Sequence, residues 1–581
     1  MPPRIALAPD PHGPGGRLQP LDDSGTPLGP PVHAPDLAAA VAGQEAASHP
    51  RWVWAATDGA YAPLLPKLPG RLARCHDLRL TEALLLTHEG RYGQPRSLGA
   101  AWARIHRLAV PPDLPDTGGA GDQDTLFAPD RLQLPPATDP LQAVVAVHAD
   151  QQRRLQEITE PAAAAGPAPA AGAGSPARAR FRLLVAAESA GALVAAEMAF
   201  DGLPWRADIH DAMLTELLGP RPHIPGTQPR RLAELAAELQ QALGGRPFNP
   251  DSHTQVLRAF ADQGVQLGST RSWELRGVDH PAAALLIRYK ELSRIHAAHG
   301  WAWQDAWARG GRFRPEYVVG GVVSGRWASR GGGALQIPRI LRGAVVADPG
   351  WLLVVADAAQ LEPRVLAALS EDAGLARSAA EGDLYEALAA SAFQGDRAKA
   401  KLGLLGAMYG QTSGDIGPLL ATLRRRYPAA MGYVEAAART GEDGGVVRSR
   451  LGRVCPPPSA DWLDFTEDPG NAAEGGARSA RARGRFTRNF VIQASAADWA
   501  LALLAALRRR LGALDTAAAD RPHLVFFQHD EVVVHTPANL ADEVAAAVAE
   551  AAEEARTLVF GATPVRFPLS TAVVECYADA K

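Results

Sequence analysis

The stretch FFQHDEVVVHTP, residues 526–537, decides the fold of this chain, because it predicts a β-hairpin with acidic residues at its turn. Two short apolar runs flank His529, Asp530 and Glu531. Adjacent carboxylates at such a turn are able to hold a metal ion. Asp-containing turns between strands are also common as plain solvated turns. The hairpin alone therefore leaves both interpretations open.

A second acidic site lies upstream, in WLLVVADAAQLEPRVLAALS, residues 351–370. Asp357 ends a strongly apolar strand and Glu362 opens a helix. Carboxylates on two separate strand ends suit a two-metal site, in which Mg²⁺ ions about 3.5–4 Å apart stabilise the attacking and leaving oxygens of a phosphoryl displacement. The oxygens of aspartate are the hard ligands that Mg²⁺ prefers. The two sites together favour the metal-binding interpretation.

Composition sets only broad limits. The 581 residues allow several domains, and the 47% hydrophobic fraction fits a globular protein. A net charge of −4 gives no global basic signature, so contacts with nucleic acid would have to come from local patches. Three scattered cysteines are too few for a disulfide framework, which favours a reducing cytoplasm. We expect no signal peptide and no membrane span, because no uninterrupted apolar run reaches about 18 residues.

The chain divides at PAAAAGPAPAAGAGSPARAR, residues 161–180, a Pro/Ala/Gly tract that predicts a linker over 161–184. Before it, RIALA and WVWAA predict strands, and the regions 79–108 and 138–158 predict helices, so residues 1–160 form a compact α/β domain. After it, the apolar spacing predicts a helix-rich start and then an alternation of strand, helix and hairpin to the end.

A third motif, DRAKAKLGLLGAMYG, residues 396–410, predicts a helix with a functional face. Four side chains recur every fourth residue and spiral along one face over about 18 Å: Arg397, Lys401, Leu405 and Tyr409. Two cations followed by an aromatic would match a nucleoside triphosphate. The alternative is an ordinary amphipathic helix, against which the glycines at 403, 406 and 410 argue, because each disfavours a helix and suggests a close approach to the backbone.

A fourth motif, residues 485–507, predicts a helix on which Arg485, Asn489 and Gln493 share one face. Hydrogen-bond donors on such a face could contact the acceptors that every correct base pair presents in the minor groove. A solvated helix start explains the same residues, and both interpretations stay open.

Taken in order, these motifs resemble the polymerase part of the family A DNA polymerases, the group of bacterial DNA polymerase I. DAAQLEPR is similar to motif A of that family, RAKAKLGLLGAMYG to motif B and QHDE to motif C. Lesser signatures fall in the same order: FNPDS at 248–252, YKELSRI at 289–295, SGRWAS at 324–329 and LQIP at 335–338. The resemblance covers about residues 185–581.

The resemblance implies an α/β multidomain architecture, a right-hand polymerase fold preceded by a ribonuclease H-like domain of the 3′–5′ exonuclease type. The implied ranges are residues 1–160 for the exonuclease-like domain, 185–581 for the polymerase, about 230–300 for the thumb, about 310–370 and 485–581 for the palm and about 371–484 for the fingers. The implied activity is template-directed addition of dNTPs to a primer 3′-OH, by a monomer in the cytoplasm, associated with the nucleoid, acting on primer-template DNA in repair or gap filling.

The resemblance also implies residue roles. Asp357 and Asp530 would bind two Mg²⁺ ions, and the catalytic set would be Asp357, Asp530, Glu531 and Lys401. The incoming nucleotide would contact Arg397, Lys401, Leu405, Tyr409, Glu362, Gln360 and His529, with Glu362 filling the space that a 2′-OH would need. The primer-template would contact Arg326, Arg485, Asn489 and Gln493.

The sequence also departs from the family pattern. Ala358-Ala359 replaces the usual Tyr-Ser of motif A, and Leu404-Leu405 replaces the Asn-Phe of motif B, which puts sugar selection, rate and fidelity in doubt. The first strand supplies only Asp10, and Ala146 stands where the catalytic Tyr of the exonuclease would be, so we expect no proofreading. We also expect no separate 5′-nuclease domain. A catalytically weak or dead DNA-binding homologue is the alternative. A single-subunit RNA polymerase is disfavoured by Glu362 and Glu531.

Overall fold

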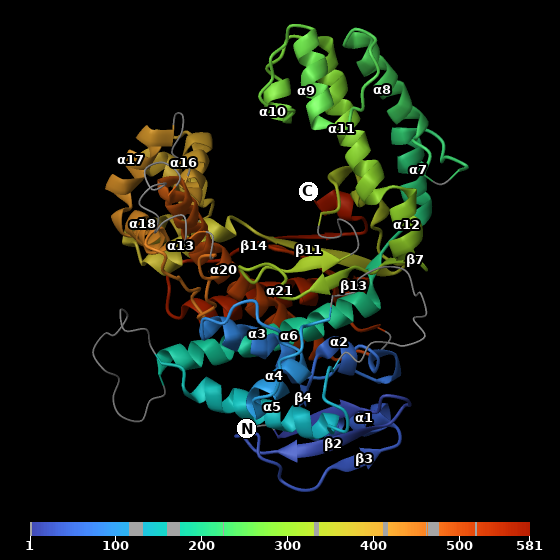
Figure 1. Cartoon of the computed structure of the whole chain (residues 1–581), viewed down its shortest axis with the longest axis vertical. Coiled ribbons are helices and arrows are strands. Elements are labelled where there is room, and N and C mark those ends of the chain that lie inside the picture. Colours follow the sequence, from blue (N-terminus) through green and yellow to red (C-terminus); the bar gives the residue numbers. More distant parts are fainter. Residues whose placement is uncertain are drawn as a thin grey trace.

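The structure is a computed structural model that describes residues 3–114, 132–159, 175–224, 226–330, 336–380, 382–410, 416–459, 462, 476–517 and 520–580. Figure 1 shows an N-terminal domain at one end of the molecule, a central sheet, and two groups of helices that rise on either side of that sheet. The green helices α7 to α11 form one group, and the yellow and orange helices α16 to α18 form the other. The arrangement is the right-hand polymerase fold with a further α/β domain beneath it.

The N-terminal domain contains a five-stranded sheet in the order β3-β2-β1-β4-β5. The first three strands pair antiparallel, whereas β1, β4 and β5 pair parallel. This is the strand order of ribonuclease H-like domains, as expected. The strands are β1 (Arg4–Pro9), β2 (Gly16–Leu21), β3 (Val32–Ala34), β4 (Arg51–Trp54) and β5 (Arg74–Asp77). The helices are α1 (Leu37–Ser48), α2 (Thr57–Ala60), α3 (Leu78–His88), α4 (Leu98–His106) and α5 (Pro140–Gln156).

The palm is a four-stranded antiparallel sheet in the order β12-β13-β11-β14. Its strands are β11 (Trp351–Ala358), β12 (His523–Gln528), β13 (Glu531–Pro537) and β14 (Leu569–Val574). Alternate residues of β11 enter two different cores. Val354 and Ala356 pack in the core with α20 (Ala477–Gly512) and α21 (Ala541–Phe560), and Leu353 and Val355 pack in the core at the thumb base. Burial on both faces explains why this strand is apolar at every position before Asp357.

The thumb helices enclose a core of their own, which includes Leu232, Leu239, Phe260 and Leu286. They are α7 (Ala207–Leu218), α8 (Arg230–Ala242), α9 (His253–Asp262), α10 (Ser272–Leu275) and α11 (Pro281–His299). At the thumb base lie α12 (Trp301–Trp307) and the short strands β6 (Leu203–Pro204), β7 (Ala308–Arg309) and β8 (Arg312–Phe313), with the pair β9 (Glu316–Val318) and β10 (Ala328–Arg330) beyond them.

The fingers side contains α13 (Leu361–Ser370), α14 (Ala373–Ala380), α15 (Leu384–Ala392), α16 (Arg397–Tyr409), α17 (Ile416–Arg426) and α18 (Pro428–Glu442). One predicted boundary is wrong. The predicted linker 161–184 ends too late, because α6 (Pro176–Asp201) begins at Pro176, and a proline is tolerated at the first helical position. The boundary between fingers and palm at 484/485 falls inside the continuous helix α20. Residues 161–174 and Leu335 of LQIP lie outside the described residues.

Among the residues that the structure describes, two helices, α6 and α20, are long and apolar enough to cross a membrane by length and composition. The sequence expectation considered only uninterrupted apolar runs and did not identify them. Within the fold, 67% of the most apolar window of α6 and 89% of that of α20 are buried. Their apolar character is explained by their position between the palm sheet and the N-terminal domain (Figure 1).

A buried ion pair joins the N-terminal domain to the polymerase part. Arg508 of α20 donates to both carboxylate oxygens of Glu197 on α6, at 2.8 and 2.7 Å, and the hydroxyl of Tyr61 donates to the same carboxylate at 2.6 Å. Arg508 also donates to the backbone carbonyls of Leu72 and Ala73. Although burial acts to raise it, the charge of Arg508 holds the pKa of Glu197 below its usual value. The guanidinium therefore connects three segments that are distant in the sequence.

We predict that Arg508→Ala destabilises the chain by about 3 kcal/mol, because it leaves the buried carboxylate of Glu197 without its counter-charge. The neighbouring change Arg509→Ala is the matched control. Arg509 pairs with Glu554 at the surface, where its side chain is 62% exposed, and its loss should cost less than about 1 kcal/mol. Urea unfolding of both variants measures the difference. Equal losses would show that the Arg508 contact does not hold the two domains together.

Candidate active site

The turn between β12 and β13 is hydrogen-bonded to the end of β11. Between β12 and β13, His529 adopts a left-handed backbone conformation with φ of 57°. The register sets Glu531 directly opposite Asp357, and the backbone carbonyl of Asp530 accepts a hydrogen bond from the amide of Ala358 at 2.8 Å. The two predicted metal ligands, Asp357 and Asp530, therefore lie on neighbouring segments at one edge of the palm.

Three carboxylates at this edge differ in their surroundings. Asp530 is exposed and Asp357 is half-buried, whereas Glu531 is only 5% exposed. The hydroxyl of Tyr577 donates to Glu531 at 2.6 Å. Burial and this hydrogen bond raise the pKa of Tyr577. Glu531 thus lies in the protein interior, whereas the side chains of Asp357 and Asp530 are accessible to solvent.

A carboxylate on α13 joins the palm to α16. Glu362 accepts from Arg326 through one oxygen and from the hydroxyl of Tyr409 through the other, the latter at 2.5 Å. Burial and the contact with Glu362 raise the pKa of Tyr409. The side chain of Glu362 is 13% exposed. The residue predicted to exclude a 2′-OH is therefore fixed by a cation and a phenol.

The row of side chains predicted on one helix lies on α16. Arg397 donates to Asp383 at 2.6 Å, Lys401 is exposed, and Leu405 is half-buried. At Gly403 the close approach to the backbone comes from other parts of the protein. A Cβ at Gly403 would lie 3.2 Å from Leu419 and 3.4 Å from Phe393, so close packing against neighbouring helices explains the glycine without a ligand.

Gly410 lies at the end of α16, where its backbone conformation requires a glycine-like residue. Gly410 stops the helix in a left-handed conformation with φ of 68°. At this end α16 meets α20, because a Cβ at Gly410 would lie 3.0 Å from the side chain of Arg485. Arg488 also donates to the carbonyl of Ala407 at 2.8 Å. The face of α20 predicted to contact DNA therefore begins where the row on α16 predicted to bind the nucleotide ends.

A pocket of about 240 Å³ lies where these elements meet. Its lining combines the three main motifs with two small residues of α20 and with Arg326: Arg326, Gln360, Leu361, Glu362, Pro363, Leu405, Tyr409, Ala496, Ala497, His529 and Asp530. Seven of these had been predicted as site residues from the sequence. The other predicted residues, Asp357, Glu531, Arg397, Lys401, Arg485, Asn489 and Gln493, lie outside this lining.

One wall of the pocket holds an imidazole. Burial and the nearby charge of Arg326 lower the pKa of His529, although Glu362 acts to raise it. His529 is therefore neutral at pH 7 and able to accept or donate one hydrogen bond without carrying charge.

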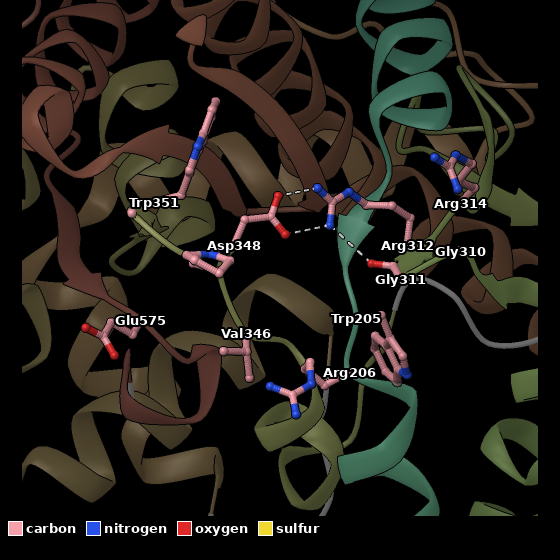
Figure 2. Close-up of a pocket in the computed structure, with 13 residues that line it drawn as sticks. Trp205, Arg206, Gly310, Gly311, Arg312, Arg314, Val346, Asp348, Trp351 and Glu575 are labelled. Carbon is pink, nitrogen blue, oxygen red and sulfur yellow. Dashed lines mark hydrogen bonds and ion pairs between the residues drawn. The ribbon is translucent and has the colours of Figure 1, made fainter. Parts of the chain in front are cut away.

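A second and larger hollow, of about 750 Å³, lies at the other end of β11 (Figure 2). It surrounds Trp351, which is six residues and about 20 Å along the strand from Asp357. Figure 2 shows Arg312 joined to both oxygens of Asp348, and Arg206 is paired with Asp208. The smaller pocket, by contrast, is lined by residues of all three acidic and basic motifs, among them Glu362, Tyr409 and Asp530, so we treat it as the candidate active site.

The donor set at the palm edge fits Mg²⁺. Two aspartate carboxylates supply hard oxygen ligands, and the exposure of Asp530 leaves coordination positions to water and phosphate oxygens, as Mg²⁺ prefers.

Comparison with known proteins identifies the family. The model of DNA polymerase family A matches residues 227–574, which is more than half of the chain. The chain is a member of DNA polymerase family A. Among its curated relatives, the thermostable DNA polymerase I of Thermus filiformis is 29% identical over 371 residues, covering 56% of this chain and 42% of the relative. DNA polymerase I of Chloroflexus aurantiacus is 27% identical over 351 residues, covering 53% of this chain and 35% of the relative. The chain thus spans less than half the length of these relatives.

The fold likeness extends beyond the sequence match. A solved structure of the polymerase domain of Pol1 from M. smegmatis, in complex with DNA primer-template and dNTP, superimposes with a TM-score of 0.70 at 18% identity and covers 99% of this chain and 95% of that one. The family match begins at residue 227, whereas the structural likeness includes the N-terminal domain. The N-terminal domain of this chain therefore resembles that solved structure in fold, outside the range of the family match.

Proposed function

We propose that this family A polymerase is a DNA-directed DNA polymerase that adds dNTPs to a primer 3′-OH with Mg²⁺. The observation that carries the proposal is the pocket in which Asp530, Glu362 and Tyr409 meet, because it unites the hairpin turn, α13 and α16 around one small volume. The family membership and the DNA-bound and dNTP-bound relative of the same fold support it.

Each part of the site has a role in this proposal. Asp357 and Asp530 would hold the Mg²⁺ ions, which when bound supply electrostatic stabilisation of the reacting oxygens. Arg397 and Lys401 would bind the triphosphate. The side chains of Arg326, Arg485, Asn489 and Gln493 would contact the primer-template, with donors that suit minor-groove acceptors. We further propose a cytoplasmic monomer, associated with the nucleoid and without membrane contact, that acts in DNA repair or gap filling.

Asp357→Asn and Asp530→Asn should each lower primer extension by at least about 100-fold, equivalent to about 2.7 kcal/mol in the barrier. Each change keeps the shape of the side chain and removes one charge from the metal-binding edge. Primer extension with matched measurements of duplex binding and thermal unfolding tests this. Asp542→Asn, at an exposed position of α21, controls for the change in net charge. Extension above a few per cent of the parent in either site variant would overturn the metal assignment. A parent chain that binds duplex but does not extend a primer would favour the catalytically dead homologue.

Glu362→Ala should weaken discrimination against ribonucleotides by roughly tenfold or more, about 1.4 kcal/mol, because the carboxylate would exclude a 2′-OH by its volume. Glu362→Gln is the matched control, since it keeps the volume and removes the charge that pairs with Arg326. The ratio of kcat/KM for dNTP to that for rNTP should fall only in the alanine variant. Unchanged ratios in both would remove Glu362 from the role of sugar gate.

We propose that the N-terminal domain does not proofread, because its carboxylates are engaged in separate contacts. Asp10 pairs with His33 at 3.0 Å. Asp77 is buried and accepts from the amide and hydroxyl of Thr57 at 2.8 and 2.7 Å. Asp150 pairs with Arg153 and Arg154 on its own helix. Hydrolysis by two metal ions needs several carboxylates around one phosphodiester.

The purified protein should therefore leave a mismatched primer 3′ end unshortened in Mg²⁺ without dNTPs. Gel analysis of end-labelled primer over time measures this directly. Shortening that is abolished by Asp10→Ala or Asp150→Ala, yet persists in Asp530→Asn, would show that the N-terminal domain is an active exonuclease.

A further inference from the structure

An acidic residue on the fingers side contacts both the palm and the nucleotide-binding helix. Asp383 precedes α15 and caps it, because its Oδ1 accepts from the amide of Glu386 at 3.0 Å. Its Oδ2 accepts from Arg397 at 2.6 Å. Gln360 of the palm is a further hydrogen-bond partner of Asp383, and its side-chain oxygen accepts from the amide of Leu384 at 2.8 Å. Asp383 thus joins Gln360 to the first residue of α16.

The surroundings of Arg397 make this contact specific. The guanidinium lies over the ring of Tyr385 at 5.5 Å, and its side chain is 47% exposed. Glu386 is the other acidic group that acts on it, more weakly than Asp383. In the described part of the chain, Asp383 is the carboxylate that forms an ion pair with Arg397.

Both ends of the row on α16 are held by carboxylates. Arg397 pairs with Asp383 at the start of the helix, and Tyr409 donates to Glu362 at its end. Lys401, between them, is exposed to solvent. A triphosphate that approaches this face meets the exposed Lys401, but it has to compete with Asp383 for the charge and hydrogen bonds of Arg397.

We propose that Asp383 is a positioning residue that lowers the affinity for the incoming nucleotide by competing with its triphosphate for Arg397. The inference rests on the proposed polymerase function. An arginine forms charge-assisted hydrogen bonds to carboxylates and to phosphates, so the two anions compete for the same cation, above all for the N–H group that Asp383 already occupies. The carboxylate also repels the triphosphate, because both are anions at close range.

Asp383→Asn separates this role from the cap, because asparagine caps a helix as well as aspartate does and carries no charge. Asp383→Ser is a second neutral cap. Asp396→Asn is the matched control: Asp396 caps α16, accepting from the amide of Lys399 at 2.9 Å, and its ion pair is with Lys399 rather than Arg397. The control makes the same change in charge next to the same helix.

Primer extension should show KM for dNTP about two- to five-fold lower in Asp383→Asn and Asp383→Ser, the range expected for losing one partly exposed ion pair, with a smaller change in kcat. Asp396→Asn should leave KM within about 1.5-fold of the parent. In an Arg397→Gln background, Asp383→Asn should no longer lower KM. An unchanged or higher KM would show that Asp383 does not compete, or that it prepares Arg397 for binding. An equally large fall in KM in the Arg397→Gln background would show that the Asp383 carboxylate acts only by repelling the nucleotide and not by competing for Arg397. Either result overturns the proposal.

Binding of inorganic tripolyphosphate in Mg²⁺, followed by calorimetry on the full chain, tests the same contact without catalysis. Asp383→Asn should tighten it by the same two- to five-fold. If the parent does not extend a primer, the proposed polymerase function fails, and this second measurement still decides the role of Asp383. Equal binding by the parent and both neutral variants would overturn that role.

Discussion

The active site depends on the register between β11 and β13. Asp357 lies opposite Glu531, and the bond from the amide of Ala358 to the carbonyl of Asp530, at 2.8 Å, closes the ladder at its last residue. Both faces of β11 are buried, so a slip of one residue would move every apolar side chain into the other core. The cores on the two sides therefore fix the position of two carboxylates that neither core contains.

Three acidic side chains around the site are each held by a hydrogen-bond donor. Glu531 is bound by Tyr577, Glu362 by Arg326 and Tyr409, and Asp383 by Arg397. Each buried or half-buried carboxylate is thereby satisfied by a donor. Two of these donors are the side chains proposed to meet the nucleotide, so the resting site holds its binding groups against internal anions.

Local sequence patterns predicted the elements that carry the chemistry, because each depends on a short period. The hairpin, the apolar strand before Asp357 and the four-residue spacing on α16 were all evident from fewer than 15 residues each, as were β1 and β4 of the N-terminal domain. The contacts that complete the site were not predictable in this way. Tyr577 lies 46 residues from Glu531, and Asp383 lies 14 residues from Arg397 outside any motif. The start of α6 was missed because an alanine- and proline-rich tract is typical of linkers, although Pro176 suits a first helical turn.

Another set of long-range contacts lies next to the loop that carries Arg326. A Cβ at Gly325 would lie 2.4 Å from the guanidinium of Arg453. That guanidinium is buried, forming an ion pair with Glu188 at 2.6 Å and lying 3.7 Å from Asp498.

Burial raises the pKa of Asp498 to about 6. The charge of Glu188 acts in the same direction, whereas that of Arg453 acts to lower the pKa. The triad joins α6, α20 and the loop before α20, three segments that also support the N-terminal domain or the fingers. Gly325 packs on this triad, and the next residue, Arg326, binds Glu362, so two neighbouring residues connect the proposed sugar gate to these buried charges. The exclusion of a 2′-OH in this polymerase would then depend on packing beyond the pocket as well as on the gate itself.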